Sequence, residues 1–108
     1  MKRWNVIVEL PAQQDIAECH LWIAERDVEA ADRWFYSIYD TIGSLEVFPD
    51  RCPLAPEGKF LNCEIREIFH GRRQYKYRIL FTVVRNKVHI LHVRHGARLA
   101  LGEPFFEK

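Results

Sequence analysis

The hydrophobic pattern of the chain changes from a helical to a strand-like period near its midpoint. Between residues 11 and 45 apolar positions recur every three or four residues. This predicts two helices, the first starting at Pro11 and the second capped by Asp27. From residue 65 onward, alternation predicts strands at 65–69, 75–84 and 88–95, and the β-branched stretch WNVIVEL at 4–10 predicts another before the helices.

The order of these elements, β-α-α-β-β-β, predicts an α+β domain. Two antiparallel helices should pack on one face of a mostly antiparallel four-stranded sheet. Residues 48–63 have no period and contain Pro49, Pro53, Pro56 and Gly58, so we expect a long loop, a kind of segment that is often functional. Neither side of this loop could bury a core alone, so 1–108 should form a single domain.

Composition narrows the class of protein. A chain that is 48% hydrophobic is too rich in core-forming residues to be disordered. No apolar run approaches the ~18 residues of a membrane span, and the apolar stretch near the N-terminus is too short for a signal peptide, so we expect a cytoplasmic protein. Cys19, Cys52 and Cys63 are odd in number and widely spaced, which indicates neither a disulfide framework nor a zinc site.

The charge is divided between the two halves of the chain, although the net charge is only +1. Residues 1–57 hold five basic against eleven acidic side chains, and residues 58–108 hold eleven basic against four acidic. Four of the five histidines also lie in the second half. This asymmetry suggests a polyanionic partner for the basic half, while the alternative is a basic sheet that complements acidic helices.

The last two strands are predicted to form a tight hairpin around residues 85–87. Pairing Val84 with His89 places Arg78 opposite His95 on one face, and places His92 and Arg94 on the other face. Arg98 follows just after the strand. We therefore expect Arg78, His95 and Arg98 to form a cationic cluster at the end of the sheet, joined by Arg66 from the neighbouring strand.

The chemistry of this cluster fits phosphate better than metal. His89, His92 and His95 are evenly spaced, but on a strand the middle one points away and the outer two are ~20 Å apart. Zinc needs its ligands within a few ångströms, so we predict neither a metal site nor a cofactor. Arginine forks suit phosphate oxygens, and a histidine could transfer the proton in a cleavage of RNA through its 2′-hydroxyl.

The chain resembles the RelE/ParE superfamily of toxins from type II toxin–antitoxin (plasmid stabilization) modules. The likeness covers nearly the whole sequence. It includes A-x-x-D-I-x-x-C-x-x-W-I at 12–23 and L-x-x-F-P at 45–49. Its most specific part is YRILFTVVRNKVHILHVRHGAR at 77–98, which is similar to the last hairpin of the family.

The resemblance implies a toxin that a separate antitoxin neutralises, and it offers two mechanisms. RelE-like members cut messenger RNA on the ribosome, whereas ParE-like members poison DNA gyrase. Arg78 and Arg98 match positions where RelE-like enzymes carry arginines, and Arg66 matches one of their lysines. However, Pro104, Phe105 and Phe106 stand where a C-terminal tyrosine is expected, and Glu64 replaces a further lysine.

These departures and the His-Gly-x-Arg ending favour the ParE-like branch, a gyrase inhibitor that acts by binding. The alternative is a ribosome-dependent messenger RNA endonuclease with Arg78, His95 and Arg98 as catalytic residues, and with His92 as a second choice for proton transfer. In either case Arg66, Arg78, Arg94 and Arg98 are predicted to contact nucleic acid or the antitoxin. In a toxin that acts by binding, the loop 53–62 or the C-terminal tail should also matter.

Overall fold

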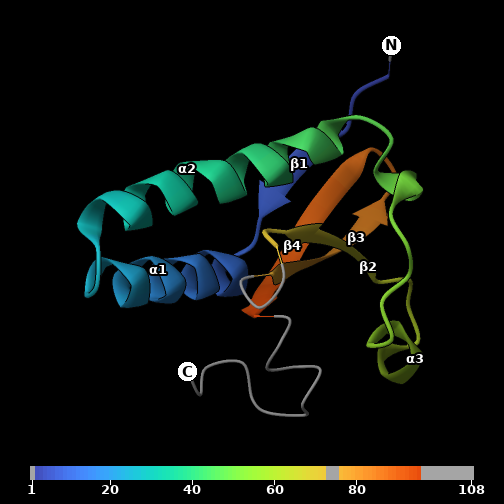
Figure 1. The fold of residues 1–108 in the computed structure, drawn as a ribbon. Helices are drawn as coiled ribbons and strands as arrows, with labels where there is room; N and C mark the ends of the chain where they lie inside the picture. Colours follow the sequence, from blue (N-terminus) through green and yellow to red (C-terminus); the bar gives the residue numbers. More distant parts are fainter. Residues whose placement is uncertain (1, 73–75, 96–108) are drawn as a thin grey trace.

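The computed structural model describes residues 2–72 and 76–95. Within them, the elements follow the predicted order, with one further helical turn, α3, in the long loop (Figure 1). Their bounds are β1 (Asn5–Val8), α1 (Leu10–Ala24), α2 (Val28–Gly43), α3 (Gly58–Leu61), β2 (Arg66–His70), β3 (Tyr77–Val84) and β4 (Lys87–His95), with 3₁₀ turns at Ser44–Glu46 and Pro49–Arg51. The predicted α+β class and the order of the main elements are confirmed.

The four strands form one sheet in the order β1-β4-β3-β2. β1 runs parallel to β4, and the other neighbouring pairs are antiparallel. The helices α1 and α2 lie side by side on one face of this sheet (Figure 1). We call this the helix face, and the opposite side the open face.

Local sequence explains where the helices begin. Asp27 caps α2, because its carboxylate accepts a hydrogen bond of 3.0 Å from the backbone N–H of Ala30. Pro11 lies in the first turn of α1, where its missing N–H costs no helical hydrogen bond. Each helix buries one stripe of small and branched residues, as the helical period predicted: Ala12, Ile16 and Cys19 in α1, and Ala31, Ile38 and Ile42 in α2.

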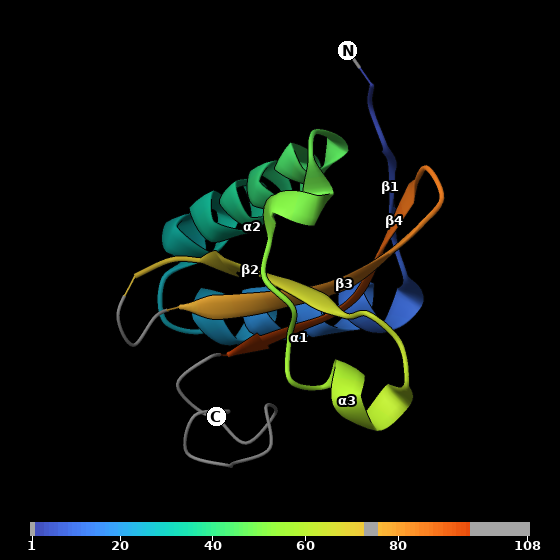
Figure 2. The same ribbon diagram turned by 90° about the vertical axis from the view of Figure 1, so that its right-hand side faces the viewer.

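The main core fills the space between the helices and the sheet. Ile38, Ile79, Phe81 and Ile90 are fully buried there. A second, smaller cluster of Ala55, Ile65 and Leu80 lies on the open face. Figure 2 shows the segment between α2 and α3 crossing in front of β2, an edge strand, with which Leu54 forms a β-bridge at Arg66. The predicted loop thus runs past the β2 edge, and its Ala55 covers part of the open face.

The predicted loop is long, and it contains ordered turns. Phe48 adopts a left-handed φ of 47° before the turn at Pro49–Arg51, and Asn62 adopts a φ of 54° after α3. Ala55 donates a backbone hydrogen bond of 2.7 Å to Ile65, which pins the loop to the start of β2. Within the described ranges, 2–72 and 76–95, no helix is both long and apolar enough to cross a membrane.

The predicted pairing of β3 with β4 is wrong. Val84 pairs with Lys87, so the turn holds only Arg85 and Asn86, and Arg85 takes a left-handed φ of 59°. The register then shifts between Leu80 and Phe81, as in a β-bulge that adds one residue to β4.

The corrected register places Arg78 opposite Arg94, and Tyr77 opposite His95. Since paired residues share a face of the sheet, Arg78 and His95 lie on opposite faces and not together.

Candidate functional site

The strongest polar cluster of the open face is centred on Arg78. Its guanidinium donates to both carboxylate oxygens of Glu57, at 2.8 and 2.9 Å, and lies 2.7 Å from Glu67 Oε1. Glu57 belongs to the loop and Glu67 to β2, so this single side chain ties three segments together. Arg78 is only 9% exposed, and both of its ionic partners are internal to the chain.

The ionic contacts around Arg78 stabilise the charged forms of Arg78 and Glu57. Burial opposes the charge of Arg78, but its hydrogen bonds to Glu57 and Glu67 outweigh this effect and raise the pKa of the guanidinium. The hydrogen bond from Arg78 is also the largest influence on Glu57, and it lowers the pKa of that carboxyl. This guanidinium already donates to two carboxylates. It is therefore poorly placed to bind a phosphate.

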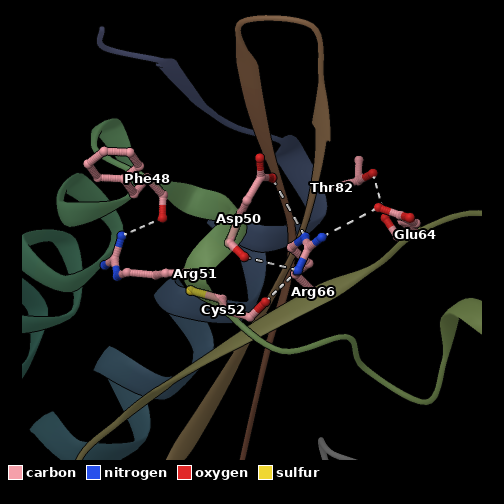
Figure 3. A network of polar contacts seen from close by, with 7 residues as sticks. All are labelled: Phe48, Asp50, Arg51, Cys52, Glu64, Arg66 and Thr82. Atoms are coloured by element: carbon pink, nitrogen blue, oxygen red, sulfur yellow. Dashed lines mark hydrogen bonds and ion pairs between the residues drawn. The ribbon is translucent and has the colours of Figure 1, made fainter. Parts of the chain in front are cut away.

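Arg66 lies on the helix face, because it pairs with Phe81, whose side chain is in the main core. Its Nη1 donates to the backbone carbonyls of Asp50 and Cys52, at 3.3 and 2.6 Å (Figure 3). The Asp50 and Glu64 carboxylates lie 3.8 and 3.6 Å from the guanidinium. Arg66 therefore holds the start of the long loop against β2, and its charge is largely balanced.

The expectation that Arg66, Arg78, His95 and Arg98 line one cationic surface is wrong for the three that lie in the described ranges. Arg78 is on the open face, whereas Arg66 and His95 are on the helix face. The Tyr77 ring lies 5.2 Å from the His95 ring, edge to face. Arg94 lies on the open face opposite Arg78, and Arg98 is outside the described residues. A binding role for any one of these arginines stays a prediction.

Two histidines of β4, His89 and His92, each pair with a carboxylate near the start of α1. His92 Nδ1 lies 2.9 Å from Asp15, which also accepts the backbone N–H of Val93 at 3.0 Å. His89 Nδ1 lies 2.7 Å from Glu9. Over residues 2–72 and 76–95, no group of three or more histidine, cysteine or acidic side chains could hold a metal ion. The pairs instead connect α1 with β4.

His70 is a further polar centre, and the sequence pattern did not single it out. Ser37 donates its hydroxyl hydrogen to the carbonyl of Trp34, so its oxygen accepts from Nε2 of His70 at 3.0 Å. Nδ1 then accepts from the Thr41 hydroxyl at 2.7 Å. Burial lowers the pKa of His70, so the neutral ring is favoured and links β2 to α2.

Sequence reasoning also missed the acidic partners of Arg78. Strand alternation does place Glu67 on the face opposite Ile68, which is a usable signal for one of them. Glu57 offered no such signal, because it lies in an aperiodic loop 21 residues away from Arg78.

The loop itself forms an open pocket next to α3. Its volume is about 630 Å³, and its walls combine apolar side chains with Lys59. The lining residues include Leu54, Ala55, Pro56, Lys59, Asn62 and Ile65. Two apolar side chains of α3, Phe60 and Leu61, are strongly exposed beside it. Glu64 also lines the pocket, so both a basic and an acidic side chain stand among its apolar walls.

Comparison with solved structures finds the same fold in another protein. A chain of the chromosomal ParDE toxin–antitoxin system from P. aeruginosa superposes with a TM-score of 0.67 at 13% sequence identity. The match covers 86% of this chain and 96% of that one. At such low identity the likeness concerns the fold.

The family itself follows from the sequence profile. Residues 6–100 match the profile described as "ParE toxin of type II toxin-antitoxin system, parDE". The chain therefore belongs to the ParE toxin family and is a ParE-like toxin. The predicted resemblance, including the preference for the ParE-like branch, is confirmed. A comparison with curated proteins found no match.

Proposed function

We propose that this toxin acts by binding and inhibiting DNA gyrase, and that a cognate antitoxin neutralises it in the cytoplasm. Membership of the ParE family supports both partners. The observation that carries the choice of mechanism is the double pairing of Arg78 with Glu57 and Glu67. A RelE-like nuclease would use the arginine at this position to bind phosphate. Here Arg78 instead forms ion pairs within the chain.

Dispersal of the basic residues supports the same choice. Cleavage of RNA at a phosphate needs a proton-transfer group and cationic groups around one point. Arg66 and Arg78 lie on opposite faces, and each has acidic partners within the chain. A toxin that acts by binding does not need these groups to meet at one point.

One observation favours the nuclease alternative. The Asp15 carboxylate holds Nδ1 of His92 at 2.9 Å, an arrangement that orients an imidazole for proton transfer through its other nitrogen. The His92 side chain is 39% exposed, so a substrate could approach it.

Two assays with the purified protein distinguish the mechanisms. In a purified translation reaction, the 5′ ends of the messenger are mapped with and without the toxin. In a binding measurement, the toxin is titrated against immobilised gyrase subunits. We expect unchanged messenger ends and saturable binding to gyrase. New ends inside codons that disappear in His92→Ala would overturn the proposal in favour of the endonuclease.

A further inference from the structure

Three large apolar side chains of the loop are exposed, one before α3 and two within it. Phe60 is 89% exposed, Leu61 62% and Leu54 57%. Phe60 and Leu61 are consecutive residues of α3, and Leu54 lines the pocket next to that helix. Single exposed apolar residues are common on proteins, but a group that flanks one pocket marks an interaction site more often than chance.

The loop that presents these side chains is fixed before any partner binds. Glu57, the residue just before α3, is held by the two hydrogen bonds from Arg78. Gly58 lies so close to the following chain that a Cβ atom would stand 2.6 Å from the carbonyl oxygen of Cys63. Asn62 ends α3 in the left-handed conformation. The Glu57 hydrogen bonds, the close approach at Gly58 and the left-handed Asn62 therefore fix the conformation of this surface turn. Its apolar side chains contribute little to the core.

The pocket supplies a charge as well as apolar walls. Lys59 and Glu64 line it, and Glu64 lies 3.6 Å from Arg66. In the part of the chain that the structure describes, Lys59 has no carboxylate within ion-pair distance. An apolar side chain that enters beside Leu54, with a carboxylate close to it in space, would complement both features.

We propose that segment 54–65 is the surface through which the toxin contacts its target protein. Phe60 and Leu61 are the apolar anchors, and Lys59 pairs with an acidic side chain of the target. This inference rests on the proposed function, because it takes gyrase as that target. The occupant is a short protruding part of a folded protein surface, since the pocket is lined only by residues between Leu54 and Ile65. A disordered segment that folds on the toxin would instead need an extended groove.

The test compares three surface variants of the full-length toxin in a supercoiling assay with purified gyrase. Phe60→Ser should raise the concentration for half-maximal inhibition about tenfold or more, as loss of an interface anchor does. Lys59→Glu should raise it roughly threefold to tenfold and reduce its dependence on salt. The matched control is Tyr36→Ser in α2, a residue that is 70% exposed and outside the segment, and it should change the value less than about twofold.

Folding is checked by circular dichroism and thermal unfolding, which all three exposed substitutions should leave close to the wild type. Phe60→Ser and Lys59→Glu proteins that inhibit gyrase as well as the wild type would overturn the inference. An equal loss in Tyr36→Ser would overturn it too, because the effect would not be specific to the segment. If the wild type itself fails to inhibit gyrase, the proposed function falls first and the inference falls with it.

Discussion

Glu57 and Arg78 form two parallel hydrogen bonds, Oε1 to Nη2 at 2.8 Å and Oε2 to Nη1 at 2.9 Å, across 21 residues of sequence. This is the bidentate geometry in which arginine holds a carboxylate most firmly. The contact joins the long loop to the centre of the sheet, and Glu67 completes it from β2. The arginine that suggested phosphate chemistry in the sequence thus has a structural role that is visible in its contacts.

Removal of Arg78 should therefore destabilise the fold. Arg78→Ala leaves the Glu67 carboxylate, whose side chain is only 13% exposed, without its cation. We expect a loss of about 3 kcal/mol in the free energy of unfolding, measured by urea denaturation, because an uncompensated buried charge is costly. Arg33→Ala, at an exposed position of α2, should stay within about 0.5 kcal/mol of the wild type. Equal stability of both variants would contradict the structural role.

Two glycines of the chain should respond to alanine in opposite directions. Gly58→Ala forces a Cβ atom against the carbonyl of Cys63, at 2.6 Å, and should cost about 1–3 kcal/mol in unfolding free energy. Gly43→Ala has open space around the new Cβ and a φ of −62°, so it should stabilise α2 by roughly 0.5–1 kcal/mol. Chemical denaturation of the two variants measures both values. A Gly58→Ala protein as stable as the wild type would show that the loop is less closely packed than described.

Stability should also depend on pH through His70. Burial lowers the pKa of this histidine in the folded protein below its ordinary value of 6.5. The unfolded chain then binds a proton more readily, so the contribution of His70 is complete above pH 6.5 and is lost as the pH falls through the folded pKa. Unfolding free energies measured from pH 7.5 to 5 should decline less steeply in His70→Gln than in the wild type. Identical slopes would contradict the assignment of a partly buried, neutral imidazole.

The element order, the Asp27 cap of α2 and the core stripes could be predicted because each depends on the local sequence. Asp27 caps its helix as expected, and Ile16, Ile38 and Ile42 face the core. The pairing of β3 with β4 could not be predicted. The two-residue turn and the bulge at Leu80 and Phe81 have no recognisable pattern in this sequence. That shift moved His95 to the face opposite Arg78.

The candidate site failed as a single cluster for a related reason. Charge counts along the chain report which residues are basic, but they do not report which carboxylates fold against them. Glu57 and Asp50 approach Arg78 and Arg66 from the aperiodic loop, whose path depends on tertiary contacts. The expectation that the loop 53–62 matters in a toxin that acts by binding remains a prediction, and the exposure of Phe60 now gives it a specific residue.

The most direct measurement for the central claim is the supercoiling of relaxed plasmid DNA by purified gyrase at increasing concentrations of the wild-type toxin. A toxin that acts by binding gyrase should reduce supercoiling in a saturable manner. Arg33→Ala should behave as the wild type, since the exposed surface at that position lies outside the proposed interface. Undiminished supercoiling at toxin concentrations far above that of gyrase would contradict the proposed function.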